Sequence, residues 1–432
     1  MTTPHRKLLF TNCTVWTGEI GSAARREVLV EDRHITQVAE TIDRATVPDA
    51  LIIDLQEATL IPGLVDGHSH LSFLEPASIV EFGYTPPEEH LLQTMHNAKR
   101  VLEAGFTSCV GASSAKARLD IAIRNAINRG EIPGPRLLAS TPELTVTGGL
   151  GDERLLHIYR ESEAVVVDGP DEVRKYVRTM AREGCDIIKL TISGSPLLEH
   201  ARAGATVMTE AEIAAASTTA KQFGKRLASH SHSSEAVQLS IKHGIEMIHH
   251  ATLIDAETQD MVEEAKDRIF LGPAIGSMHN SCFEAAEFGI TPEAAARNGM
   301  KGNMDSAIQV YSALRKRNIR VVIGGDYGFA WTPHGTQGRD LKHFVDYFGY
   351  SAEEALVCGT VTGAAAMRME DRIGRIKPGF LADMVAVRGK PHVDASCLSG
   401  PDLISLVVKD GELHGRGALR CRLATPGQTV AV

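Results

Sequence analysis

The sequence predicts an α/β protein: a (β/α)8 TIM barrel carrying a small β-sandwich domain built from both termini. The middle of the chain alternates between short apolar runs and longer stretches with helical spacing, which indicates a parallel sheet covered by helices. Both ends instead contain short β segments separated by turn and charged residues. The two ends are therefore expected to meet in one small domain.

The β segments of that small domain can be placed one by one. LLFTNCTVW, EVLVED, HITQVAE and ALIIDL fall within residues 7–60, whereas DMVAV and ISLVVKDGELH lie near the C-terminus. Pro62-Gly63 and Pro378-Gly379 mark the junctions with the middle of the chain. We expect residues 1–61 and 372–432 to form the small domain and residues 62–371 to form the barrel.

About eight strands are expected between residues 62 and 326, enough to close a barrel. After the first strand they are FTSCVGAS, PRLLAST, DIIKLTIS, RLASHSHS, IEMIHHAT, RIFLGPAI and RVVIGGD. Residues 171–183 have the spacing of a helix that stops at Gly184, and Thr209-x-x-Glu212 is a capping box that opens another. Active sites of such barrels lie at the carboxyl ends of the strands.

Composition narrows the function classes. Lys and Arg number 45 against 54 Asp and Glu, a net charge of −9, which argues against a nucleic-acid binder. No run approaches the roughly 18 apolar residues of a membrane span, and no signal-peptide core is visible. Seven dispersed cysteines without a Cys-x-x-Cys pair suit reduced thiols. We expect a cytoplasmic protein with a small-molecule substrate and neither nucleic-acid nor membrane partners.

Several predicted strand ends carry metal-ligand chemistry. His68 and His70 are two apart in GHSH, so in a strand both imidazoles point to the same side. Lys189 lies in the apolar strand DIIKL, where burial would lower its pKa. A neutral amine can react with carbon dioxide to give a carbamate that bridges two divalent ions. The alternative is a Lys189 side chain that snorkels to solvent or forms an ion pair.

Two later strands end in histidines and the last in an aspartate. His230 ends RLASH, and His250 ends IEMIHH after His249. Neutral imidazole is a common ligand of zinc and related ions. Asp326 ends RVVIGGD, where it suits metal binding and general base catalysis, or alternatively a helix N-cap. His232 and His249 remain open as additional contacts or packed residues.

Together these motifs resemble the amidohydrolase superfamily of metal-dependent hydrolases. The matches are LIPGLVDGHSHL, the lysine of DIIKL, the two histidines that end strands, GGD and RIGRIKPGFLADMVAV. The resemblance implies two divalent ions, zinc first with cobalt or manganese also suitable. The implied metal ligands are His68, His70, Lys189 in carboxylated form as the bridge, His230, His250 and Asp326. A metal-bridging hydroxide would attack the substrate, and Asp326 would move the proton to the leaving group.

The strand-4 lysine separates this chain from deaminase-type members of the superfamily. The sequence is most similar to the branch of imidazolonepropionase-like proteins, Xaa-Pro and Xaa-Arg dipeptidases, ochratoxin-type amidases, and phenylurea and molinate hydrolases. Two residues depart from that branch: Leu150 replaces a histidine of a Thr-Gly-Gly-His-Gly segment, and His249 replaces a glutamate. We expect from this a less polar substrate than a dipeptide.

The predicted activity is hydrolysis of an amide, urea or carbamate-type C–N bond, with an aryl urea, anilide or thiocarbamate as the first substrate class. A dipeptidase or N-acyl amino acid hydrolase is the alternative, followed by a mononuclear heterocycle deaminase and a catalytically silent binding module. Met278, Phe329 and Trp331 are candidates for an apolar pocket. The residues predicted to touch substrate are Leu150, His232, His279, Tyr327 and His334. The resemblance also implies a homo-oligomer.

Overall fold

The computed structural model describes residues 7–418, 421, 424 and 427–432. Contacts divide the chain into two compact units. The first comprises Met1–Asp66, Lys99–Ser108 and Gly335–Val432, and the second comprises Gly67–Ala98 and Cys109–His334. The predicted barrel domain ran to residue 371, whereas these contacts group the chain from Gly335 onward with the termini. Helices α10 (Arg339–Phe348) and α11 (Ala352–Val357) pack against the 3-10 helix Ala395–Leu398, which explains this grouping.

The first unit contains a nine-stranded mixed sheet assembled from both ends of the chain. The order is β17-β16-β15-β5-β1-β2-β3, and β4 pairs with β1 and β18. The strands are β1 (Lys7–Val15), β2 (Ala24–Glu31), β3 (His34–Ala39), β4 (Leu51–Asp54), β5 (Thr59–Pro62), β15 (Met384–Val387), β16 (Ile404–Lys409), β17 (Glu412–His414) and β18 (Thr429–Ala431). Antiparallel pairing of β15 with β5 joins the two ends, which confirms the predicted terminal β domain.

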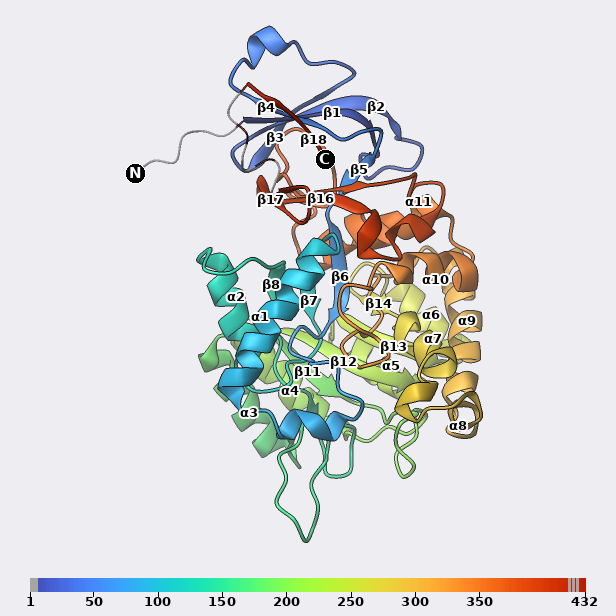
Figure 1. The fold of residues 1–432 in the computed structure, drawn as a ribbon. Coiled ribbons are helices and arrows are strands. Elements are labelled where there is room, and N and C mark those ends of the chain that lie inside the picture. Colours follow the sequence, from blue (N-terminus) through green and yellow to red (C-terminus); the bar gives the residue numbers. More distant parts are fainter. Residues whose placement is uncertain (1–6, 419–420, 422–423, 425–426) are drawn as a thin grey trace. The chain divides into compact units, whose positions relative to one another are not determined.

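Seven barrel strands lie in two parallel ladders, β6-β7-β8 and β11-β12-β13-β14, and the two-residue strands β9 and β10 extend the second ladder beyond β11 (Figure 1). They are β6 (Leu64–Ser69), β7 (Phe106–Gly111), β8 (Arg136–Leu138), β9 (Leu144–Thr145), β10 (Val165–Val166), β11 (Ile187–Thr191), β12 (Arg226–Ser233), β13 (Met247–Leu253) and β14 (Phe270–Gly272). Isolated parallel bridges close the circle: Ser140 pairs with Ile187, Leu271 with Val321, and Ser69 with Tyr327. The predicted TIM barrel is thereby confirmed.

The eighth barrel position is irregular rather than a continuous strand. Only Val321 and Tyr327 form bridges there, and between them Asp326 has a φ of 62°. A left-handed backbone at a non-glycine residue interrupts a regular ladder. The predicted strand RVVIGGD therefore holds its place in the barrel but lacks regular pairing at its carboxyl end.

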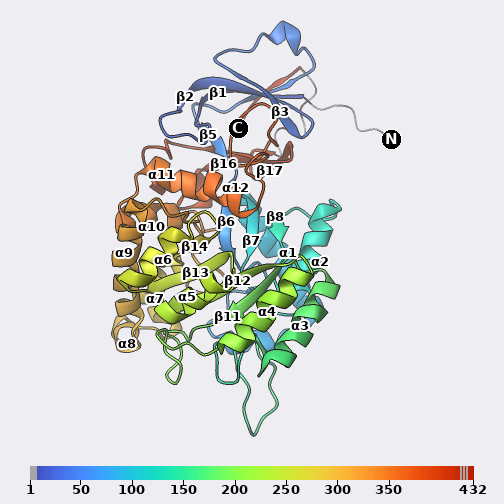
Figure 2. The same cartoon turned by 180° about the vertical axis from the view of Figure 1, so that it is seen from behind.

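Helices alternate with these strands and cover the outside of the barrel. They are α1 (Pro87–Glu103), α2 (Leu119–Asn128), α3 (Pro170–Glu183), α4 (Glu210–Gln222), α5 (Ser234–Lys242), α6 (Ala256–Glu264), α7 (Ile275–Phe283), α8 (Pro292–Arg297) and α9 (Met300–Lys316), and α12 (Gly363–Ala366) follows in the first unit. Figure 2 shows α4 and α5 lying over β11–β13. Among the helices described, none combines the length and the apolar character that crossing a bilayer requires.

The predicted helix boundaries have local causes. Helix α3 begins with Pro170 in its first turn and ends at Gly184, whose φ of 96° only glycine adopts readily. Helix α4 starts at the predicted capping box, in which the Thr209 side chain accepts from the backbone N–H of Glu212. These caps fix the residues at which the two helices begin or end. They thereby fix where the chain turns between helix and strand beside the cavity.

We expect Gly67→Ala to destabilise the barrel. A Cβ added at Gly67 in β6 would lie 2.4 Å from Cγ2 of Val322 and 2.9 Å from the carbonyl oxygen of Ile323. Overpacking of this kind costs about 1–3 kcal/mol, so thermal unfolding should show a lower Tm. The matched control is Gly302→Ala in α9, where nothing lies within 4 Å of an added Cβ. An unchanged Tm for Gly67→Ala would contradict this close strand packing.

Candidate metal centre and active site

A cavity lined by residues of the second unit contains most of the predicted metal ligands. Segments from the carboxyl ends of β6, β12 and β13 and from the irregular eighth position contribute to it. The titratable residues that line it are His68, His70, Glu143, Glu163, His230, His232, His250 and Asp326. The strand ends thus bring together side chains that are widely separated in the sequence, as the barrel topology predicts.

The first group that could hold a metal ion is His68, His70 and Asp326, whose ligand atoms lie within 4.8 Å of one another. Oδ1 of Asp326 is 2.9 Å from Nε2 of His70 and 3.6 Å from Nε2 of His68. Nδ1 of His70 lies 3.3 Å from the carbonyl oxygen of Ser113, which only accepts. In a neutral His70 ring, Nε2 therefore presents a lone pair to a carboxylate oxygen. Two acceptors at that distance require a proton or a metal cation between them.

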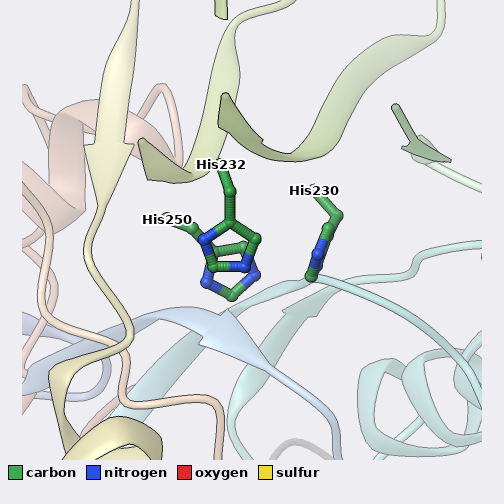
Figure 3. Close-up of side chains that lie close together, drawn as sticks. All are labelled: His230, His232 and His250. Carbon is green, nitrogen blue, oxygen red and sulfur yellow. The ribbon is translucent and has the colours of Figure 1, made fainter. Parts of the chain in front are cut away.

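The second group that could hold a metal ion is His230, His232 and His250, whose side chains lie close together (Figure 3). The rings of His232 and His250 stack with centroids 4.3 Å apart, and His230 meets His250 edge-on at the same centroid distance. Nε2 of His250 is buried and has no hydrogen-bond partner. Because buried polar atoms are normally satisfied, this nitrogen is suited to a metal ion. His232, predicted as a substrate contact, lies within this group of candidate ligands.

An unusual backbone brings two adjacent histidines of β13 to the same place. His249 pairs with His230 in the ladder, so in a regular strand His250 would point to the opposite side. The φ angles of His250 and Ala251 are 74° and 47°, a left-handed conformation that costs about 1–3 kcal/mol per non-glycine residue. The kink allows His250 to join His230 while His249 stacks on His68 at 3.8 Å. Strain of this kind is concentrated at functional sites.

Lys189 is fully buried in β11, so the alternative in which its side chain snorkels to solvent is excluded. Its Nζ lies 2.8 Å from Nδ1 of His249, and among the described residues no carboxylate lies within ion-pair distance of it. Burial lowers the pKa of Lys189, which favours the neutral amine. The neutral form is the one that can react with carbon dioxide, so the environment of Lys189 is compatible with the predicted carbamate.

Burial also keeps the surrounding imidazoles neutral. It lowers the pKa of His68, His230, His249 and His250 well below the ordinary value. For His232 the same cause lowers the pKa to about 3. Neutral imidazole is the form that binds metal ions. These five imidazoles are therefore ready to bind cations without first losing protons.

A hydrogen-bond chain fixes the orientation of His232. The Thr252 hydroxyl donates to Oδ1 of Asn303 at 2.6 Å, so it accepts from Nδ1 of His232 at 2.7 Å. This arrangement places the proton of His232 on Nδ1 and leaves a lone pair on Nε2. All three residues are buried. This hydrogen-bond chain thus keeps Nε2 of His232 as an acceptor in the cavity.

We predict that Thr252→Val weakens metal binding by about 10–100-fold, the usual effect of removing a group that orients a metal ligand. The measurement is titration of metal-free protein with Co²⁺, followed by its visible spectrum. Thr360→Val is the matched control, because Thr360 is equally buried but donates to the carbonyl of Leu356 within its own helical segment. Equal Co²⁺ affinity in the two variants would contradict a role for the chain in orienting His232.

The five predicted substrate contacts separate into two groups. Leu150 and His232 line the cavity, as do the apolar candidates Met278, Phe329 and Trp331. Outside the lining are His279, which pairs with Glu284 at 3.2 Å, Tyr327, which is buried beside the ligand segment, and His334, whose Nε2 lies 3.0 Å from the carbonyl oxygen of Phe73. Loop position alone suggested these three, and their contact with a substrate stays a prediction.

Two buried acids in the cavity wall were missed by sequence reasoning. Glu143 precedes β9 and Glu163 precedes β10, and both line the cavity. Glu143 comes two residues after the predicted strand PRLLAST, which is a usable signal for a residue at a strand end. Glu163 lies in a polar stretch with no periodicity, and only the folded structure reveals its burial.

Comparison with known proteins gives a consistent result. The amidohydrolase family model matches residues 59–413. Ochratoxinase from Aspergillus niger is 23% identical over 376 residues, which cover 82% of this chain and 75% of the relative. A solved amidohydrolase structure has a TM-score of 0.84 at 26% identity, covering 95% of this chain and 99% of the other. A solved Xaa-Pro dipeptidase has a TM-score of 0.82 at 26% identity, covering 94% and 99%.

Proposed function

This chain belongs to the amidohydrolase family and is a hydrolase acting on carbon–nitrogen bonds, and on this premise we propose that it cleaves an amide, urea or carbamate with two divalent metal ions. The observation that carries the proposal is the position of Lys189. It is buried without an ion-pair partner, in contact with His249, which itself stacks on His68. A deaminase-type site with one ion has no evident need for a lysine in that position.

The proposed ligands match the donors in the cavity. His68, His70 and Asp326 would hold one ion. His230 and His250, with His232 as a further donor, would hold the second, and carboxylated Lys189 would bridge the two. Zinc is the first choice, and cobalt or manganese also suits nitrogen and oxygen donors. When bound, such ions lower the pKa of a water molecule and polarise the carbonyl group of the substrate.

Asp326 is the proposed catalytic residue. Its side chain is 21% exposed, so it can reach a substrate in the cavity. Burial raises the pKa of Asp326, but the interaction with the His70 imidazole outweighs this and holds the pKa below its ordinary value. The carboxylate is therefore ionised near neutral pH. It would accept the proton of the attacking water and deliver it to the leaving nitrogen.

The cavity wall supports an aryl-bearing substrate, such as an aryl urea, anilide or thiocarbamate. The rings of Phe329 and Trp331 stack with centroids 5.1 Å apart and planes within 7°, and Phe73 meets Phe329 edge-on. All three line the cavity with Leu150. Aromatic side chains of this kind bind flat apolar groups through stacking and edge contacts. The second candidate is a dipeptide or N-acyl amino acid, supported by the similarity to a Xaa-Pro dipeptidase.

The test is hydrolysis of two substrate panels by metal-loaded protein. One panel contains anilides, phenylureas and thiocarbamates, and the other contains Xaa-Pro and Xaa-Arg dipeptides and N-acyl amino acids. Turnover of the first panel with the higher kcat/KM supports the proposal, and turnover of dipeptides only would favour the second candidate. Release of ammonia from heterocycles with one ion per chain, or no hydrolysis at all, would overturn the proposal.

We also propose a cytoplasmic homo-oligomer that has a small-molecule substrate and neither nucleic-acid nor membrane partners. All seven cysteines are free thiols, which suits a reducing compartment. Leu156 and Tyr159 are almost fully exposed on the loop between Leu150 and Glu163, and exposed apolar groups of this size favour contact with a second copy. Light scattering on the purified protein measures the assembly directly, and a mass of one chain would contradict it.

A further inference from the structure

We infer that Glu143 and Glu163 form a subsite for a positively charged nitrogen group of the substrate, such as an ammonium or guanidinium. This inference rests on the proposed hydrolysis, because the subsite lies in the wall of the same cavity. It adds a requirement that neither the metal ligands nor the aromatic wall imposes: a cationic group on the molecule that is cleaved.

The fold places the two acids next to each other. The backbone N–H of Val165 in β10 donates to the carbonyl oxygen of Glu143 at 2.8 Å, which brings the segment carrying Glu163 alongside β9. Gly151 passes close to the same side chain, since a Cβ there would lie 2.8 Å from Oε2 of Glu163. Glu143 is 6% exposed and Glu163 is 4% exposed. Both carboxylates are thus held in a buried wall rather than at the surface.

Neither carboxylate has a cationic partner in the described part of the chain. Glu143 accepts from the Thr191 hydroxyl at 2.9 Å, and Glu163 accepts from the Ser113 hydroxyl at 3.0 Å. No lysine, arginine or histidine of the described residues lies within ion-pair distance of either acid. Burial and the neighbouring Glu143 raise the pKa of Glu163 well above its ordinary value, because a second unpaired negative charge in this wall is expensive to desolvate. A cation in the cavity would provide the missing partner.

The nearest candidate within the chain does not meet this need. Glu143 and Glu163 both favour the charged form of Lys189, but its Nζ contacts His249 instead. Carboxylation of Lys189, as proposed above, would replace its positive charge with a negative one. The carbamate would add a negative charge to this region, which makes ionisation of Glu163 still more costly unless a cation is present. An external cation is therefore more strongly favoured once Lys189 is modified.

The aromatic residues of the same cavity indicate what the rest of the ligand should be. Phe73, Phe329 and Trp331 provide an apolar aromatic surface in the same cavity. A ligand that contacts both these aromatic residues and the two acids needs an apolar portion and a cationic nitrogen. An organic cation suits the acids better than a third metal ion does, because no histidine accompanies them and each has one oxygen already engaged by a hydroxyl.

The experiment compares two chromogenic anilides that differ in one charged group, 6-aminohexanoyl p-nitroanilide and heptanoyl p-nitroanilide. In the unsubstituted protein the aminohexanoyl compound should have the higher kcat/KM. Glu143→Gln and Glu163→Gln should each lower that value about 30-fold or more, mainly through KM, as expected when a buried charge loses its partner. Turnover of the heptanoyl compound should change by less than about 3-fold.

Glu161→Gln is the matched control, because Glu161 lies two residues from Glu163 but is exposed and pairs with Lys116. It should leave both substrates unaffected. Equal kcat/KM for the two anilides, or equal losses for both in the glutamine variants, would overturn the subsite and leave the proposed hydrolysis intact. If either single variant fails to fold, as judged by circular dichroism, the other one decides.

A binding measurement separates failure of the subsite from failure of the proposed function. Calorimetric titration with benzylamine and benzyl alcohol does not depend on turnover. Benzylamine should bind the unsubstituted protein more tightly than benzyl alcohol does, and this preference should disappear in Glu143→Gln/Glu163→Gln. If neither anilide is cleaved but the preference for benzylamine is present, the proposed anilide-type activity fails and the cation subsite stands. Absence of the preference overturns the subsite.

Discussion

Replacing Asp326 with asparagine is expected to lower kcat by about 10²–10⁴-fold, the usual contribution of a general base. Asparagine keeps an oxygen in the same place but cannot accept a proton at neutral pH. KM should change much less, because the cavity wall that binds the substrate stays intact. Steady-state kinetics on the best substrate of the panel, with metal content measured on the same sample, provide the test.

The control for this prediction is Asp255→Asn. Asp255 is the N-cap of α6 and accepts from the backbone N–H of Thr258 at 2.8 Å. Asparagine caps a helix as well as aspartate does, so activity and stability should both be retained. If Asp326→Asn kept more than one tenth of wild-type kcat with its metal content unchanged, another group would have to be the base.

The position of Asp326 illustrates what the sequence could and could not predict. An apolar run followed by Gly-Gly-Asp indicated a carboxylate at a strand end, and strand–helix alternation indicated the barrel around it. The left-handed backbone at Asp326, with a φ of 62°, has no sequence signature because aspartate adopts it only where the surrounding fold requires it. The irregular eighth strand was therefore unpredictable.

The histidines of β12 and β13 also divide into positions that the sequence could predict and positions that it could not. His230 and His232 are two apart in β12, so period-two alternation already placed both rings on one face. That rule could have included His232 among the candidate ligands, but the sequence reasoning predicted it only as a substrate contact. For His249 and His250, which are adjacent, alternation predicts opposite faces. The kink at His250 explains how His250 joins His230 while His249 stacks on His68.

Burial of loop residues was the least predictable feature. Glu163 lies on a connection whose sequence resembles any polar loop, and its burial depends on contacts with distant residues such as Ser113. For helices α10 and α11, too, the sequence does not show which distant residues they contact. Their amphipathic pattern predicts a helix but not its partner, so the boundary at residue 371 differs from the compact units of the structure.

Lys189→Ala should abolish activity, with a loss of about 10³-fold or more. A bound metal contributes several kcal/mol to transition-state stabilisation, which corresponds to a loss of that size. Metal content should fall below two ions per chain, and short carboxylic acids such as propionate should restore part of the activity by filling the space of the missing carbamate. Kinetics and elemental analysis on the same preparation measure both effects.

Lys116→Ala is the matched control for Lys189→Ala, since Lys116 is 9% exposed and pairs with Glu161 at 3.0 Å but does not line the cavity. It should retain both ions and full activity. A fully active Lys189→Ala protein with one ion would instead support the mononuclear deaminase alternative. Loss of activity without rescue by propionate, and with two ions retained, would mean that Lys189 acts as an amine, for which its contact with Nδ1 of His249 is the structural basis.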